Sequence, residues 1–190
     1  RYHTVLRAMF NLMNDPIPTF LHATARAEQA GWPVGAPLIV VSIATQQAAL
    51  LLSPGAWHGL WTVSTAAAGT GNEPGSNRTP TGLHGVCERI GDGAPPGTEF
   101  RSRIPTGRVI QPGADSGTDD LILTRILWLD GLQPGVNEHS RGRYIYLHGT
   151  NREDMLGSPA SHGCVRMANA DILHLFELLA PHPDVYCWLE

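Results

Sequence analysis

Long apolar runs are missing from this sequence: none approaches the roughly 18 residues that a helix needs to cross a bilayer. Residues 1–20 also lack the apolar segment of a signal peptide, so the chain itself does not indicate its compartment. The sequence has no large excess of charge of one sign, because 13 Lys and Arg against 17 Asp and Glu leave a net charge of −4. This charge supplies no strong cationic field, which argues against binding to nucleic acid or an anionic membrane.

Cysteine is scarce as well, with only Cys87, Cys164 and Cys187. Three is too few for a disulfide scaffold, and at least one thiol stays free unless it pairs between chains. Cys87 and Cys187 lie in strand-like runs, where buried apolar cysteines are expected, and whether they pair is left open. Glycine and proline are plentiful, at 21 and 15, which favours a β-rich fold with many turns. The length of 190 residues suits one domain, or one domain with an appendage.

The first 36 residues predict an N-terminal helical extension. Residues 4–13 carry apolar side chains at helical spacing, residues 15–18 break the pattern, and Thr19 can cap a second helix over residues 20–30. We expect a helical hairpin packed on the main domain, residues 37–190, with contact to a partner or coverage of the active-site cleft as the alternative.

Beyond residue 37 the pattern changes to short β-branched and aromatic runs separated by turns. Strands are predicted over residues 38–43, 46–52, 60–64, 83–89, 120–129, 144–147 and 185–189, and one helix over 169–180 with Asn169 as its N-cap. Residues 91–118 lack periodicity and predict a long flap beside the cleft. The fold class is therefore mainly β, an antiparallel sandwich or barrel with a few helices.

The chemistry is concentrated in residues 144–167, which hold His148, His162 and Cys164. A cysteine attacks as the thiolate, and a nearby imidazole can take its proton. His148 follows an apolar strand and can approach from across a cleft, so we expect its ring within hydrogen-bonding reach of the sulfur of Cys164. The carbonyl of Gly149 could fix the tautomer of that ring. His162 would orient the loop or contact substrate.

Main-chain N–H groups of His162, Gly163 and Cys164 are candidate donors to an oxyanion. Ser161 and Arg166 are candidate substrate-binding residues, and Arg166 could meet a substrate carboxylate, although a surface arginine is an equal alternative. A buried thiol beside ordinary histidines is the alternative for the whole site. No metal site is predicted, because the spacing of the histidines and Cys164 fits no common zinc pattern.

The segment His148-Gly149-Thr150 followed by Ser161-His162-Gly163-Cys164-Val165-Arg166-Met167 resembles the signature of the L,D-transpeptidases, the YkuD-type catalytic domain. The likeness extends over residues 38–190, although many members carry Asn at the position of Arg166. It implies the β-sandwich or barrel-like fold of that family, with Cys164 as nucleophile, His148 as base and the Gly149 carbonyl as its orienting group. No metal or organic cofactor is implied.

The resemblance also implies a reaction on peptidoglycan stem peptides in the periplasm or cell envelope. Cys164 would form a thioester with release of D-alanine, and the side-chain amine of a diamino acid on a second stem would then accept the acyl group. Carbapenems would acylate the same cysteine. The alternatives are an L,D-carboxypeptidase that trims tetrapeptide stems, an enzyme that forms 1-3 cross-links, and a non-catalytic module that binds the cell wall.

Overall fold

The computed structural model describes residues 17–111, 114, 117 and 119–190, and most of its regular structure is β-strand. The helical elements are α2 (Ile17–Gln29), α3 (Asn169–Leu179) and the short 3-10 turn η1 (Glu153–Met155). The strands are β1 (Leu38–Ser42), β2 (Gln47–Ser53), β3 (Ala56–Ser64), β4 (Gly82–Ile90), β5 (Thr98–Arg101), β6 (Ile104–Val109), β7 (Ile122–Gly131), β8 (Tyr146–Thr150), β9 (Val165–Met167) and β10 (Tyr186–Leu189).

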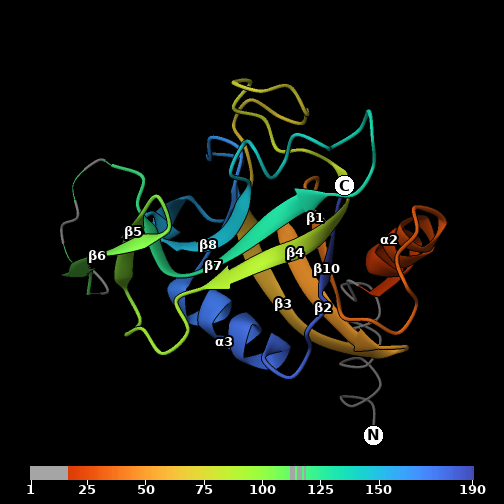
Figure 1. Ribbon diagram of the computed structural model, residues 1–190, viewed down its shortest axis with the longest axis horizontal. Coiled ribbons are helices and arrows are strands. Elements are labelled where there is room, and N and C mark those ends of the chain that lie inside the picture. The colour runs from red at the N-terminus through yellow and green to blue at the C-terminus, as the bar shows by residue number, and fades with distance from the viewer. Residues whose placement is uncertain (1–16, 112–113, 115–116, 118) are drawn as a thin grey trace, which may run out of the picture.

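The strands form one sheet in the order β4-β10-β1-β2-β3-β9-β8-β7-β5-β6. An additional pairing between β4 and β7 joins the two ends of the first eight strands, so these close into a barrel (Figure 1). The hairpin β5–β6 pairs with the first two residues of β7, before the part of that strand that pairs with β4. Neighbouring strands are antiparallel except for the pairs β1–β10 and β8–β9. The predicted mainly β class is therefore correct, and of the two architectures the barrel is the one formed.

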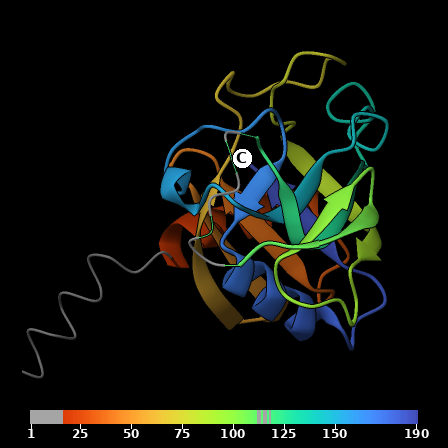
Figure 2. The ribbon, with the colours of Figure 1, turned by 90° about the vertical axis from the view of Figure 1, so that its left-hand side faces the viewer.

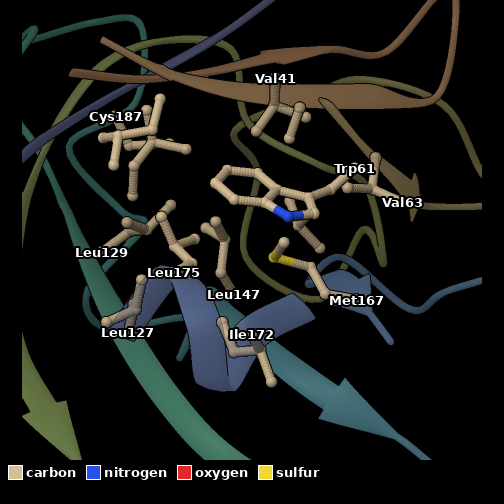
Figure 3. Close-up of a cluster of buried hydrophobic side chains, with 14 of the residues drawn as sticks. Val41, Trp61, Val63, Leu127, Leu129, Leu147, Met167, Ile172, Leu175 and Cys187 are labelled. Atoms are coloured by element: carbon tan, nitrogen blue, oxygen red, sulfur yellow. The ribbon is translucent and has the colours of Figure 1, made fainter. Parts of the chain in front are cut away.

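The main core lies inside the barrel and is completed by α3 (Figure 3). The helix directs an apolar stripe, Ile172, Leu175, Phe176 and Leu179, toward side chains from strands on all sides. This stripe is the one that the spacing of apolar residues predicts. Because α3 contacts both β7 and β8, it also supports the strand that carries His148.

Helix α2 covers the outer face of the barrel over β1 and β10. Alternate residues of β1 therefore enter different clusters: Ile39 faces the inner core, whereas Val40 packs under α2. The prediction of a helix over residues 20–30 is confirmed, but α2 begins at Ile17, so Thr19 lies inside the helix and is not its cap. The helix predicted over residues 4–13 lies outside the described residues.

Three expectations about the elements need correction. Residues 91–118 are not an irregular flap throughout, because they contain the hairpin β5–β6. Strand β8 continues to Thr150, so His148 lies within a strand and not at its end. Helix α3 is preceded by Ala168 as N-cap, and Asn169 is its first helical residue. None of the helices in the described ranges is long and apolar enough to span a membrane.

Candidate active site

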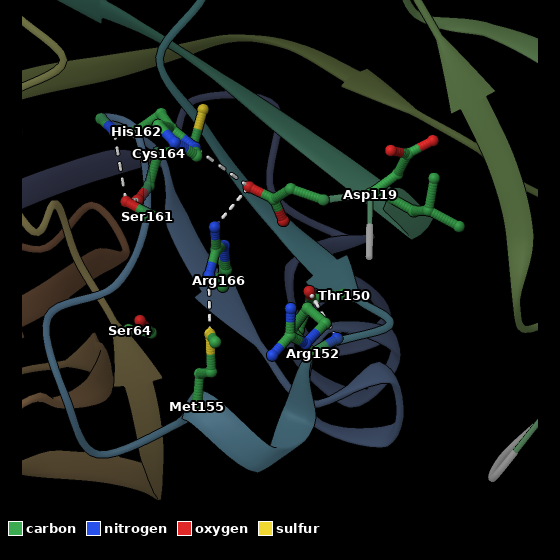
Figure 4. A network of polar contacts seen from close by, with 12 residues as sticks. Ser64, Asp119, Thr150, Arg152, Met155, Ser161, His162, Cys164 and Arg166 are labelled. Carbon is green, nitrogen blue, oxygen red and sulfur yellow. Dashed lines mark hydrogen bonds and ion pairs between the residues drawn. The ribbon is translucent and has the colours of Figure 1, made fainter. Parts of the chain in front are cut away.

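The parallel pair β8–β9 brings His148 and Cys164 to one face of the barrel wall. In this pair His148 lies opposite Arg166, and Cys164 directly precedes β9. Leu147 and Val165 point into the main core. Because successive side chains alternate between faces, His148, Cys164 and Arg166 share the outer face. Figure 4 shows Arg166 beside the loop that carries Cys164.

The Cys164 thiol is half-buried and is held between main-chain groups of two tyrosines. Its Sγ–H donates to the carbonyl of Tyr144 at 3.4 Å, and the N–H of Tyr146 donates to the sulfur, also at 3.4 Å. Tyr144 has a φ of 58°, an uncommon backbone conformation for a residue other than glycine. Burial raises the pKa of the Cys164 thiol to about 11, against smaller opposing effects from the Tyr146 N–H and two arginines. The resting sulfur is therefore protonated at neutral pH.

The His148 ring is 3% exposed and is fixed by its neighbour in the chain. Its Nδ1–H donates to the carbonyl of Gly149 at 2.7 Å, so Nε2 is left unprotonated in the neutral ring. Burial lowers the pKa of His148, with the Gly149 hydrogen bond acting in the opposite direction. The neutral imidazole has the tautomer that a general base requires.

The expected hydrogen bond between His148 and the sulfur of Cys164 is not formed in the described structure, where the thiol bonds to Tyr144 instead. The two residues are diagonal neighbours across the β8–β9 pair, a relation that long side chains can bridge. Catalytic hydrogen bonds are often long before substrate binds. The described structure thus holds the thiol and the imidazole in neighbouring positions without a hydrogen bond between them.

A bulge in β7 lies opposite the peptide bond that joins His148 and Gly149 in β8. Ile126 pairs with His148 and Leu123 pairs with Gly149. The two residues of β7 between them, 124 and 125, have no paired residue on β8. One of them, Thr124, has a φ of 70°. Bulges of this kind disrupt the regular ladder next to active sites. Here the disruption falls where the Gly149 carbonyl accepts the imidazole N–H.

The loop before β9 is shaped by Ser161 and Gly163. The Ser161 hydroxyl donates to the carbonyl of Cys164 at 2.6 Å and accepts the N–H of Gly163 at 3.2 Å. Gly163 has a φ of 130°, and its carbonyl accepts a hydrogen bond from the Thr79 hydroxyl at 2.9 Å. Ser161 is buried, and both of these hydrogen bonds of its hydroxyl lie within the loop. Of the expected oxyanion donors, Gly163 N–H is already engaged, whereas His162 and Cys164 N–H are not engaged within the described residues.

Arg166 is only 2% exposed and forms an ion pair with Asp120. The alternative of a surface arginine is therefore wrong, and its guanidinium is directed at a carboxylate of the protein itself. The same carboxylate lies 3.6 Å from Nδ1 of His162, whose side chain is 73% exposed. Asp120 belongs to the site, but no sequence pattern indicates it, because only the fold brings the residues just before β7 close to His162 and Arg166.

Arg143 is a second arginine near the sulfur, and its charge favours the thiolate. Arg143 donates to the carbonyl of Gly71 at 2.9 Å and to the hydroxyl of Ser76 at 3.3 Å, so it holds the loop of residues 69–79 against the site. Its charge and that of Arg166 favour the thiolate, whereas the charge of Asp120 opposes it. Nothing in the spacing of Arg143 and Cys164 marks this relation.

The described residues contain no group of three or more His, Cys, Asp and Glu side chains that could hold a metal ion. A cavity of about 700 Å³ lies between the β5–β6 hairpin and the start of α3. Leu123, Thr150 and Asn169 line it, so it approaches the Gly149 backbone but not the sulfur. The polar groups around Cys164 suit proton transfer and nucleophilic attack, with charge held by arginines and main-chain N–H groups.

Comparison of the sequence with protein families and with curated proteins finds the L,D-transpeptidases in both cases. Residues 36–186 match the model of the YkuD family, described as the L,D-transpeptidase catalytic domain. A Bacillus subtilis (strain 168) protein named "Putative L,D-transpeptidase YqjB" is 47% identical over 38 residues, which are 20% of this chain and 22% of that protein.

Solved structures of low sequence identity share the fold. An L,D-transpeptidase from Xylanimonas cellulosilytica has a TM-score of 0.53 at 17% identity, with 84% of this chain and 62% of that chain covered. An L,D-transpeptidase from Mycobacterium smegmatis has a TM-score of 0.51 at 12% identity, with 84% and 69% covered. The chain thus spans less than two thirds of the Xylanimonas structure and about a fifth of the Bacillus protein.

Proposed function

Because the chain belongs to the L,D-transpeptidase catalytic-domain family, we propose that it is a cysteine acyltransferase acting on peptidoglycan stem peptides in the cell envelope. One observation carries the proposal: His148 is held by the Gly149 carbonyl in the tautomer of a base, on the face of the sheet that also presents Cys164. A buried cysteine of purely structural function would have no need of such a partner.

In the first half-reaction, Nε2 of His148 takes the Sγ proton while the sulfur attacks the carbonyl between the diamino acid and D-alanine of the donor stem. The resulting oxyanion is stabilised by main-chain N–H groups, and those of His162 and Cys164 have no hydrogen-bond partner in the part of the chain that the structure describes. The imidazolium then protonates the leaving amine, the C–N bond breaks, and D-alanine departs from a thioester on Cys164. Because the resting thiol has a pKa of about 11, proton transfer accompanies the attack.

In the second half-reaction, the side-chain amine of a diamino acid on the acceptor stem attacks the thioester. His148 takes a proton from that amine, the C–S bond breaks, and the thiol of Cys164 is restored with its proton. The product is a 3-3 cross-link. Arg143 and Arg166 act on the sulfur by charge alone, and Asp120 holds Arg166 in place. Ser161 is assigned to the shape of the loop, not to substrate binding.

Product analysis tests the proposal. The enzyme is incubated with a disaccharide-tetrapeptide, and the products are identified by mass spectrometry. Cross-linked dimers with released D-alanine support the transferase, and tripeptide alone would assign the chain to the carboxypeptidases instead. A 1-3 cross-link would show that the enzyme attacks a different carbonyl of the donor stem. If folded wild-type protein forms no product, the remaining alternative is a non-catalytic module that binds the cell wall.

The nucleophile is tested separately with a carbapenem, which we expect to acylate Cys164. Intact-protein mass should rise by one adduct in the wild type but not in Cys164→Ala. Cys87→Ala is the control, because Cys87 is an exposed cysteine, and this variant should be labelled like the wild type. Equal labelling of the wild type and Cys164→Ala would overturn the assignment of the nucleophile.

A further inference from the structure

The tip of the β5–β6 hairpin places a cation next to the site. Ser102 and Arg103 form the turn, with φ values of 47° and 70°, the left-handed conformations of a tight two-residue hairpin. Figures 1 and 2 place this hairpin on the opposite side of the barrel from α2. The tip is not free in solvent, because Arg103 returns to the barrel wall at β7 and β8.

Three aromatic rings receive the Arg103 side chain. Its guanidinium carbon lies 4.5 Å from the centroid of the Trp128 ring and 5.0 Å from that of Tyr144, and Nη1 donates to the hydroxyl of Tyr146 at 3.1 Å. Trp128 also contacts both tyrosines, with ring centroids 5.7 and 5.9 Å apart. Such packing fixes the position of a guanidinium without neutralising its charge.

The same two tyrosines hold the nucleophile. The Tyr144 carbonyl accepts the Cys164 thiol and the Tyr146 N–H donates to its sulfur. Each tyrosine therefore contacts Arg103 through its side chain and the sulfur of Cys164 through its main chain. Tyr144 is 51% exposed and Arg103 is partly exposed, so this corner is open to a ligand that reaches the sulfur.

Arg103 differs from the other arginines of its hairpin in having no acidic partner within the described ranges. Arg101 and Arg108 both lie within ion-pair distance of Glu99, at 4.0 and 3.2 Å. Among the residues that the structure describes, no carboxylate lies within such a distance of Arg103, and Glu88 acts on it only from further away. A positioned guanidinium with free N–H donors and no internal counter-charge has the chemistry to bind an external carboxylate.

We propose that Arg103, seated on Trp128, Tyr144 and Tyr146, binds a carboxylate of the donor stem peptide and so sets the preference of the enzyme for donors with that group free. The proposal rests on the proposed function for the identity of the ligand. Two carboxylates of a stem are candidates: that of the terminal D-alanine, and that on the side chain of a diamino acid that carries one. Two amidated donors distinguish them: in one the carboxylate of the terminal D-alanine is a carboxamide, and in the other the carboxylate of the diamino acid is.

The test compares matched donors on wild type, Arg103→Gln, Arg103→Lys and the control Arg101→Gln, which removes the same charge from the same hairpin. KM and kcat for release of the leaving group, D-alanine or its amide, are measured by mass spectrometry with free and amidated donors. In the wild type, one amidation should raise KM by about tenfold or more, the size of a charge-assisted hydrogen bond. In Arg103→Gln this discrimination should vanish, because the free donor becomes as poor as the amidated one. Arg103→Lys should restore part of it, and Arg101→Gln should behave as wild type.

An Arg103→Gln variant that weakens free and amidated donors equally would overturn the proposal and leave Arg103 as a latch for the hairpin. Unchanged discrimination would overturn it as well. Calorimetric binding of the same donors to Cys164→Ser separates this inference from the proposed function, since it needs no chemistry. If Cys164→Ser prefers the free donor through Arg103 while the wild type turns over neither, only the proposed reaction fails. If neither donor binds, both proposals fail.

Discussion

Cys164 and His148 lie in surroundings that oppose charge on either of them. Burial raises the pKa of the thiol to about 11 and lowers that of the imidazole. A thiolate–imidazolium pair would require the reverse order of the two pKa values. The resting site therefore holds a thiol and a neutral imidazole, and the sulfur becomes nucleophilic only when a substrate brings the proton acceptor and the attack together.

Alkylation of Cys164 by iodoacetamide should follow this protonation state. We expect slow labelling at pH 7 and a rate that rises about tenfold per pH unit until the pH approaches the thiol pKa, because only the thiolate reacts. Labelling is followed by peptide mass mapping, with buried Cys187 as the reference that stays unmodified while the protein is folded. A rate that is already constant from pH 6 to 8, with thiolate absorbance at neutral pH, would show a preformed ion pair instead.

At the scale of elements, the site depends on how tightly β7, β8 and α3 meet at Gly149. A Cβ on this residue would lie 2.4 Å from Oδ1 of Asn169 at the start of α3, 2.7 Å from the carbonyl oxygen of Leu123 on β7 and 3.2 Å from Cγ2 of Ile172. The carbonyl belongs to backbone and cannot rotate away. Glycine is needed here for close approach and not for a left-handed backbone.

Gly149→Ala should therefore displace the strand that orients His148. We expect a loss of about 1–3 kcal/mol in the free energy of unfolding, the usual effect of overpacking, together with a fall of about tenfold or more in carbapenem acylation. Gly142→Ala is the matched control, because among the described residues its Cβ would meet only the His139 carbonyl, at 3.8 Å. Chemical denaturation and acylation rates measure both. Equal, small effects of the two substitutions would contradict this packing account.

The elements that sequence patterns predict are those whose side chains face a core. Residues 38–43 and 46–52 are recognisable because both become buried strands joined by a turn. Strand β6 is exposed along its whole length and carries Pro105 and Gly107, so no apolar alternation marks it. Strand β9 has three residues, too few for a periodic signal. The N-cap was misplaced by one residue because Asn169 uses its side chain on η1 and β8 instead.

The same distinction applies within the site. Cys164, His148 and Gly149 are identifiable because their residue types and order are those of a known motif and of nucleophilic catalysis. Asp120 and Arg103 come from segments that no motif covers. They reach the site through strand pairing and a hairpin turn, which depend on the register of the closed sheet and not on local spacing.

At the scale of the whole molecule, closure of the barrel depends on β4, which pairs with β10 on one side and with β7 on the other. His84 lies in this seam, opposite Cys187 and Gly131, and is fully buried. Its Nδ1–H donates to the Gly82 carbonyl at 3.0 Å, and the Ser140 hydroxyl lies 2.9 Å from Nε2. The same hydroxyl donates to the Asn137 carbonyl at 2.7 Å, so each nitrogen of the ring has an uncharged polar group within hydrogen-bonding distance.

Burial of His84 lowers its pKa from 6.5 to about 4, against a smaller opposing effect of the Gly82 hydrogen bond. Between these two values the unfolded chain binds a proton that the folded chain does not, so stability falls as the pH is lowered. One pKa unit corresponds to about 1.4 kcal/mol, so this residue should remove about 2–3 kcal/mol between pH 7 and pH 4.5. We expect this loss of stability to act on the pairing of β4 with β7 and β10. A protonated His84 ring would find only a carbonyl and a hydroxyl as partners there.

Urea denaturation of wild type, His84→Gln and His58→Gln at pH 7 and pH 4.5 tests this. His84→Gln should be less stable than wild type at pH 7, because it leaves the seam imperfectly packed, yet should lose about 2–3 kcal/mol less on acidification. His58 is exposed on β3, so its replacement should keep the wild-type pH dependence. If His84→Gln and the wild type lose the same stability at pH 4.5, acid sensitivity arises outside the seam, and His148, whose pKa burial also lowers, is the next candidate.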